Sequence, residues 1–190
     1  GVQSILFARN MMGFYILESL IRTWKVQGIE ASYERLIEEA SAAQPFGLRI
    51  DVNDPVFFSS THMEETISSY LASSKKRSTH EFGILVRSIL DSLASSFAWT
   101  IMDLDEVLET GIARLTVLGG GVRNALLCQM IADAANIEVV AGSAEATVMG
   151  NIGMQMVATG AADSIPSLQP VMECSSRGKV YTPGNHEAWI

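Results

Sequence analysis

Residues 118–124 read LGGGVRN, with three consecutive glycines between an apolar run and a segment whose apolar residues recur at helical spacing. The preceding residues, Leu115 to Leu118, predict a buried strand, and Asn124 is placed to begin a helix. A strand that ends in glycines and continues into a helix brings backbone N–H groups and a helix N-terminus to one opening. Because glycine lacks Cβ, a ligand can approach the main chain there. The stretch therefore indicates either a ligand-binding turn or a tight corner that needs glycine for packing.

The residues around the glycines exclude one nucleotide-binding pattern and weaken another. A phosphate-binding P-loop requires Lys followed by Ser or Thr after the last glycine, and neither follows here. A dinucleotide-binding fingerprint requires a third glycine where Asn124 stands, although Glu145 could serve as the acid that binds the ribose. Half of a small nicotinamide-dependent dehydrogenase stays open as a weaker alternative.

The last third of the chain alternates between strand and helix patterns. Val139 to Ala141 predicts a second strand, and Glu145 to Thr159 predicts a helix with one apolar side, formed by Met149, Ile152, Gly153, Met156 and Val157. Val180 to Pro183 closes the pattern as a strand or arm. This β-α-β-α order indicates a helix-rich α/β fold.

Helical patterns dominate the first part of the chain. Ser4 to Ala8 predicts a short strand, after which Asn10 is expected to cap a helix that stops at Gly28. Ser32 is expected to begin the next helix. Further along, a long helix is predicted from an apolar stripe that steps mainly by four residues: Leu85, Ile89, Leu93, Phe97, Ile101, Leu104 and Leu108.

Composition narrows the classes of function. The 190 residues are 48% hydrophobic and 18% charged, which fits one domain with a sizeable core. The formal net charge of −8 argues against nucleic-acid binding, which needs a basic stripe.

No apolar run is expected to span a membrane, and two cysteines without ligand spacing favour a reduced, cytoplasmic setting. The three histidines show no metal-binding spacing. Gly1 in place of an initiator Met favours a processed piece or a cloned domain.

A longer stretch carries a family resemblance. Residues 117–160, VLGGGVRNALLCQMIADAANIEVVAGSAEATVMGNIGMQMVATG, resemble the C-terminal domain of the FGGY carbohydrate kinases, and within that family the rhamnulokinases most. Further matches follow in the same order along the chain: ARNMMGFYILES, PFGLRIDVNDPVFF, RSILDSLA and YTPGNHEAW. The resemblance implies an actin-like, ribonuclease-H-like fold. Residues 1–190 would be the second of two domains, with ATP in the cleft between them.

The resemblance also implies a set of nucleotide-binding residues. Gly120 and Asn124 match positions that contact the adenosine part of ATP, and Gly119 and Gly121 shape the turn. Glu18 stands where the family has a Gln that contacts the nucleotide. A carboxylate near the ATP phosphates would be repulsive unless it were protonated or paired with a metal ion or Arg. An ordinary solvated helix glutamate is the other interpretation of this position.

The resemblance assigns no catalytic residue and no metal ligand to this chain. In the family, the catalytic Asp, most sugar contacts and the first phosphate-binding turn lie in the first half of the protein. The chain is therefore expected to be the ATP-binding half of a kinase that uses ATP with Mg²⁺ to phosphorylate a sugar, with L-rhamnulose at its primary hydroxyl favoured. Alone it is expected to bind ATP or ADP, to meet the sugar only through the missing N-terminal half, and to be inactive.

A non-catalytic binding module of the same fold is the second hypothesis. Without the other half, an apolar face would be left bare, and a bare apolar face favours self-association as a homodimer.

Overall fold

The structure is a computed structural model that describes residues 8–11, 13–30, 32–73, 81–175 and 178–190. The chain divides into two compact units, unit 1 (Gly1–Asp103) and unit 2 (Leu104–Ile190), and each is described by itself. The strand expected at Ser4 to Ala8 lies outside the described residues, apart from Ala8.

Unit 1 is built from helices. They are α1 (Tyr15–Val26), α2 (Tyr33–Ala42), α3 (Met63–Ser73) and most of α4 (Phe82–Leu108), with the short 3-10 helix η1 (Pro55–Phe57) before α3. Helix α1 packs against α3 through the fully buried Trp24, whose indole Nε1 donates to a carboxylate oxygen of Glu64 at 3.1 Å. The same ring meets Phe82 of α4 edge-on, with 4.6 Å between ring centroids. Trp24 therefore joins three helices in one core and keeps its polar N–H satisfied.

The predicted start of the first helix is wrong. Helix α1 begins at Tyr15, and its N-cap residue Phe14 makes no side-chain capping hydrogen bond, so Asn10 does not cap it. The physical reason is Gly13, which lies between Asn10 and the helix and loses more conformational entropy in a helix than any other residue.

The other two helix limits are confirmed. Gly28 has φ +76° and ends α1 in the left-handed region, where glycine carries no Cβ penalty. Ser32 is the N-cap of α2, and its Oγ accepts the Arg35 N–H at 3.3 Å.

Helix α4 confirms the long predicted helix, with 27 residues. Leu85, Ile89 and Leu93 of its stripe are buried, whereas Leu108 is 40% exposed, because the buried stretch of α4 ends at Ile101. By length and composition α4 could cross a membrane, contrary to the expectation that no run is long enough. Two thirds of its most apolar window (67%) is buried within the chain, as in the core helix of a globular fold.

An irregular segment, residues 44–60, is held against α4 by a buried charge. Asp91 of α4 is fully buried; its Oδ1 accepts from Arg87 Nε at 2.9 Å, and its Oδ2 accepts the backbone N–H of Phe46 at 2.7 Å. Phe46 has φ +60°, a conformation that a non-glycine residue keeps only when its surroundings hold it. The Arg87–Asp91 pair therefore fixes where the segment crosses the helix.

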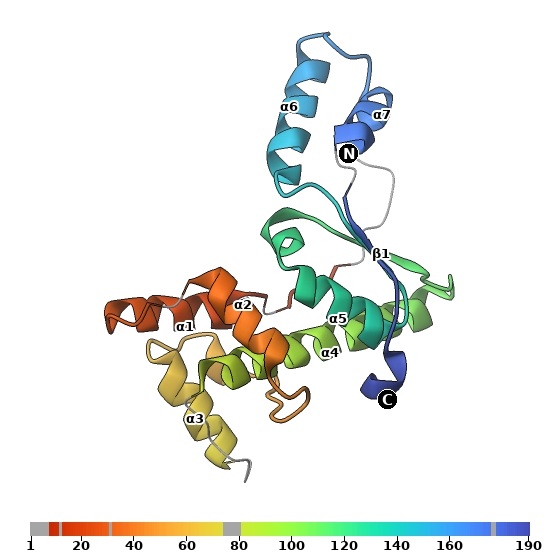
Figure 1. Cartoon of the computed structure of the whole chain (residues 1–190). Helices are drawn as coiled ribbons and strands as arrows, with labels where there is room; N and C mark the ends of the chain where they lie inside the picture. Colours follow the sequence, from red (N-terminus) through yellow and green to blue (C-terminus); the bar gives the residue numbers. More distant parts are fainter. Residues whose placement is uncertain (1–7, 12, 31, 74–80, 176–177) are drawn as a thin grey trace. The chain divides into compact units, whose positions relative to one another are not determined.

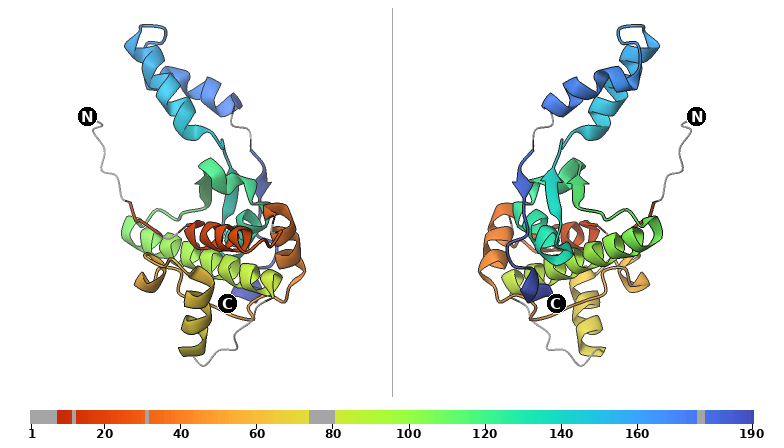
Figure 2. Two further views of the ribbon diagram at one scale, coloured as in Figure 1. Left: turned by 90° about the vertical axis from the view of Figure 1, so that its left-hand side faces the viewer. Right: turned by 90° about the vertical axis from the view of Figure 1, so that its right-hand side faces the viewer.

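Unit 2 contains a three-stranded sheet with helices around it. Its elements are β1 (Arg114–Val117), the 3-10 helix η2 (Gly119–Arg123), α5 (Ala125–Ala135), β2 (Glu138–Ala141), α6 (Ala146–Ala158), α7 (Ile165–Ser175), β3 (Val180–Tyr181) and η3 (His186–Trp189). Strands β1 and β2 are parallel, with Val117 opposite Ala141, and β3 is antiparallel to β2. Helix α5 packs against β2, and α6 lies beside α7 in every view (Figures 1 and 2). The β-α-β-α order predicted for this part is confirmed.

One burial prediction for unit 2 is wrong, and another is wrong in part. No residue of β1 is buried, because β1 is an edge strand of the described sheet and pairs only with β2. In α6, Ile152 is 52% exposed and Gly153 is the buried residue, because α6 packs mainly against α7. Both errors come from the same source: a local pattern shows which residues share a face, but not which face finds a partner.

Candidate functional site

The glycine turn, residues 119–121, is hydrogen-bonded to the loop that follows β2. Gly119 N–H donates to the Ser143 carbonyl at 2.9 Å, and Gly142 N–H donates to the Val117 carbonyl at 2.8 Å. The carboxyl ends of β1 and β2, which are parallel, therefore open at one edge of the sheet. Ligands bind at this edge in open α/β sheets.

Each glycine of the turn contributes differently. Gly119 has φ +76°, so the chain needs glycine there to leave the strand. A Cβ added to Gly120 would meet no atom within 4 Å, and Gly120 is exposed. Gly119 therefore serves the backbone geometry, whereas Gly120 leaves open space that a ligand can use.

Asn124 joins the turn to α5. It is 1% exposed; its Oδ1 accepts the Leu127 N–H at 2.9 Å, and its backbone N–H donates to the Gly121 carbonyl at 3.1 Å. It thus caps α5, as the sequence predicted, and it also closes η2. Its Nδ2 is buried without a hydrogen-bond partner among the described residues. A buried donor without a partner costs about 1–3 kcal/mol, so this amide is one that an acceptor would stabilise.

Cys128 lies against the turn, and Tyr181 of β3 lies close enough to Cys128 to affect its own titration. The Cys128 thiol lies 3.8 Å from the Gly121 carbonyl, and burial raises the pKa of that thiol, which keeps it protonated at neutral pH. Burial likewise raises the pKa of Tyr181, and the nearby Cys128 raises it further. Both side chains are therefore uncharged at neutral pH, and neither is an activated nucleophile.

Charged side chains stand at the edge of the turn. Arg123, the last residue of η2, pairs with Glu145, the residue before α6, with 3.3 Å between Nη2 and Oε1. Both side chains are exposed to solvent, at 71% and 66% respectively. Lys179 reaches the same end of the sheet, because its carbonyl accepts the Ala141 N–H at 2.9 Å. Sequence reasoning considered Glu145 only as a ribose-binding acid and missed its pairing with Arg123.

Glu18 lies elsewhere in the chain. It occupies the first turn of α1 in unit 1, where it is exposed and forms no ion pair with any described residue. The glycines and Asn124 belong to unit 2. Gly119, Gly120, Gly121 and Asn124 therefore lie together in unit 2, whereas Glu18 belongs to unit 1.

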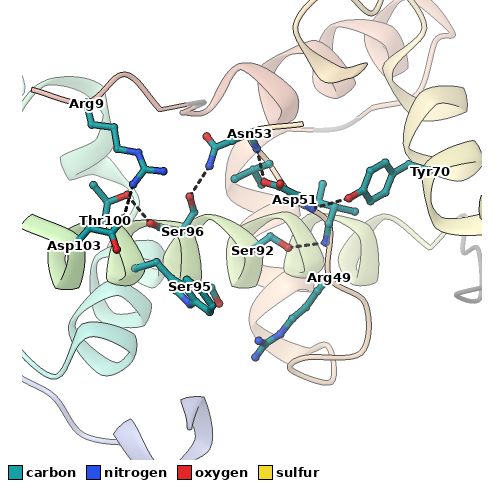
Figure 3. A pocket seen from close by; sticks show the side chains of 13 residues that line it. Arg9, Arg49, Asp51, Asn53, Tyr70, Ser92, Ser95, Ser96, Thr100 and Asp103 are labelled. Carbon is teal, nitrogen blue, oxygen red and sulfur yellow. Dashed lines mark hydrogen bonds and ion pairs between the residues drawn. The ribbon is translucent and has the colours of Figure 1, made fainter. Parts of the chain in front are cut away.

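A concave region lies in unit 1, along α4 (Figure 3). This cavity of about 510 Å³ is lined largely by polar side chains. Arg9 Nη1 pairs with Asp103 at 2.8 Å, and Asn53 Nδ2 donates to Ser96 Oγ at 2.8 Å. These two contacts pair four of the polar side chains that line the cavity with one another.

Metal binding finds no support in the described residues. They contain no group of three or more His, Cys, Asp or Glu side chains that could hold a metal ion.

Comparisons with known proteins give one consistent result. The model of the FGGY family of carbohydrate kinases, C-terminal domain, matches residues 2–159. A rhamnulokinase from Bacteroides thetaiotaomicron is 33% identical over 190 residues, which are 100% of this chain and 38% of that protein. A rhamnulokinase from Enterococcus faecalis is 35% identical over 184 residues, which are 95% of this chain and 37% of that protein.

A solved structure agrees with the fold. The xylulose kinase from Rhodospirillum rubrum matches with a TM-score of 0.60 at 20% identity, over 89% of this chain and 33% of that one. The expected actin-like, ribonuclease-H-like fold is thereby confirmed. The chain spans less than two fifths of the length of the curated relatives named above (38% and 37%).

Proposed function

Because the chain belongs to the FGGY family of carbohydrate kinases, we propose that it is the ATP-binding part of an enzyme that transfers the γ-phosphoryl group of ATP to a sugar. The family implies ATP as the co-substrate. Identity of 33% and 35% to rhamnulokinases over almost the whole chain supports L-rhamnulose as the sugar, phosphorylated at its primary hydroxyl. These relatives are bacterial enzymes of sugar metabolism, and a cytoplasmic location goes with that role.

The proposal rests on two features that adjoin in the chain. The glycine turn has open space at Gly120, and the buried side-chain Nδ2 of Asn124 has no hydrogen-bond partner among the described residues. The adenosine part of ATP would lie over Gly120, where no Cβ fills the space, between Gly119 and Gly121. Asn124 Nδ2 would find in the nucleotide the acceptor that the protein does not supply. We place Glu18 at the nucleotide on the family resemblance alone.

In this proposal, the described residues bind the nucleotide but contribute few of the groups that phosphoryl transfer needs. Phosphoryl transfer needs a base that orients the sugar hydroxyl and Mg²⁺ that neutralises charge on the phosphates. The described part of the chain contains no group of three or more His, Cys, Asp or Glu side chains that could hold a metal ion, and burial raises the pKa of the Cys128 thiol. The ligands of Mg²⁺ are therefore not assigned to this chain, and the sugar would be held by residues outside these 190.

A calorimetric titration of the chain with ADP tests the proposal. Gly120→Val adds a branched side chain where a Cβ meets nothing, so the fold should persist while the nucleotide is excluded. Gly150→Val is the matched control, because Gly150 also has open space but lies in α6. Saturable binding that Gly120→Val abolishes and Gly150→Val keeps supports the proposal. Absence of binding to the unmodified chain, or equal loss in both variants, contradicts it.

A second candidate function is a self-associating module of the same fold. Three apolar side chains of α6 are half exposed or more: Val148 at 53%, Ile152 at 52% and Met154 at 60%. Val148 and Ile152 are four residues apart and share one side of the helix, and exposed apolar side chains of this kind favour association with another copy. Sedimentation of the chain as a monomer at high concentration would remove this candidate. The nicotinamide alternative has no support from the comparisons, which point to carbohydrate kinases throughout.

A further inference from the structure

Among the described residues of unit 2, Arg123 is the cation that directly adjoins the glycine turn, and Lys179 lies at the same end of the sheet. Among the described residues of unit 2, the Lys and Arg side chains are Arg114, Arg123 and Lys179. Arg114 begins β1 and so lies at the far end of the sheet from the turn. The Lys179 ammonium is over the ring of Tyr181, 4.9 Å from its centroid. Arg123 directly follows the glycines and precedes the capping residue Asn124.

Glu145, the partner of Arg123, does not use its side chain to cap its own helix. Glu145 is the N-cap residue of α6, but its carboxylate makes no capping hydrogen bond and reaches Arg123 instead. Its backbone N–H is held by Ser143 Oγ at 3.1 Å, in the loop whose carbonyl binds Gly119. The two hydrogen-bonded loops therefore each contribute one side chain to the ion pair that stands beside the turn.

We propose that Arg123 is the residue that contacts the phosphates of the bound nucleotide, and that Glu145 occupies its guanidinium until the nucleotide arrives. The inference rests on the proposed function and assigns a role that the family resemblance did not give to either residue. The phosphates of ADP or ATP replace the Glu145 carboxylate as the acceptor of the Arg123 N–H groups. No bond is made or broken beyond these hydrogen bonds and ion pairs.

The energies favour such an exchange. An ion pair as exposed as Arg123–Glu145 contributes on the order of 0–1 kcal/mol, so breaking it costs little. An Arg–phosphate contact is charge-assisted and commonly bidentate, which makes it stronger than a single-contact pair in water. Because Glu145 keeps its negative charge after the exchange, it also opposes the phosphates. Removal of that charge should therefore tighten binding.

The test compares ADP with adenosine, which lacks the phosphates, by calorimetric titration of the whole chain at low salt. Arg123→Ala should weaken ADP binding roughly tenfold, a change equal to about 1.4 kcal/mol, and leave adenosine binding within about twofold. Arg123→Lys should retain part of the ADP affinity, since it keeps the charge but loses the planar fork. Glu145→Gln should tighten ADP binding about two- to fivefold without changing adenosine binding.

The other ion pair of the sheet supplies a matched control. Arg114 and Glu138 form an exposed pair across β1 and β2 at the end away from the turn. Arg114→Ala and Glu138→Gln make the same changes of charge and should alter binding of neither ligand. Equal weakening by Arg114→Ala would mean that net charge alone acts, which overturns the proposal.

The remaining outcomes separate this inference from the proposed function. If the unmodified chain binds neither ADP nor adenosine, the proposed function fails and this inference fails with it. If the unmodified chain binds ADP but Arg123→Ala binds it equally well, only the inference fails. If Arg123→Ala weakens ADP and adenosine alike, Arg123 shapes the turn rather than contacting phosphate, and the inference is again wrong.

Discussion

At the scale of single residues, buried polar side chains are the ones whose hydrogen bonding best indicates their role. Asp91 and Asn124 are both almost inaccessible, yet they differ in how they are satisfied. Both carboxylate oxygens of Asp91 have protein donors, whereas the amide nitrogen of Asn124 has no partner among the described residues. A satisfied buried charge indicates a structural role, whereas an unsatisfied buried donor calls for a partner that the described residues do not supply.

Asp91→Ala should destabilise unit 1 by about 3–5 kcal/mol, because it leaves Arg87 and the Phe46 N–H without their buried acceptor. Urea unfolding followed by tryptophan fluorescence measures the effect. Asp103→Ala breaks an exposed pair with Arg9 and should cost less than about 1 kcal/mol. Similar losses in the two variants would contradict the structural role of Asp91.

Glu18 offers a second test at this scale. If its carboxylate faces the nucleotide, as the family position implies, Glu18→Gln removes a repulsion and should tighten ADP binding severalfold. Glu65→Gln, in the first turn of α3, makes the same change at a residue that the family resemblance does not assign to the nucleotide. An unchanged affinity in Glu18→Gln would show that the residue is a solvated helix glutamate outside the site.

At the scale of elements, the sequence predicted structure where one local rule decides the outcome. The end of α1 at Gly28, the cap of α2 at Ser32 and the junction of strand, glycines and helix all follow from a single residue's backbone or hydrogen bonding. The predictions failed where a partner decides, as in the exposed face of α6. The Arg123–Glu145 pair was missed because its members are 22 positions apart. Opposite charges after successive parallel strands are the signal that could have found it.

The packing of α4 beneath α2 depends on Gly83. A Cβ on this residue would lie 2.9 Å from the Glu39 carbonyl oxygen and 3.0 Å from its carbonyl carbon, and backbone atoms cannot move aside cheaply. Gly83→Ala should therefore destabilise unit 1 by about 1–3 kcal/mol, measured by thermal unfolding.

Gly150→Ala is the control for that substitution, because its Cβ would meet nothing within 4 Å. In α6 it should be neutral or stabilising by about 0.5–1 kcal/mol, since Ala favours a helix more than Gly does. Destabilisation of both variants to the same degree would show that close packing is not what Gly83 provides.

At the scale of the whole molecule, our proposal assigns nucleotide binding to this chain and the catalytic groups to residues outside it. Unit 2 holds the glycine turn with its cap and ion pair, while the described residues contain no metal-binding group. A polypeptide of these 190 residues should bind ADP and yet transfer no phosphoryl group from ATP to L-rhamnulose. A coupled assay for ADP release, with the sugar present and absent, measures this. Sugar-dependent ADP release above background would mean that the chain carries catalytic residues that we have not assigned.

The central claim is that a nucleotide binds at the glycine turn, and backbone amide NMR of the chain during titration with ADP tests it most directly. Binding at the turn predicts the largest shifts at the amides of Gly119, Gly120 and Gly121 and at the side-chain amide of Asn124. The largest shifts would fall instead at Asn53 and Ser96 if the nucleotide entered the cavity along α4, and that result would contradict the account.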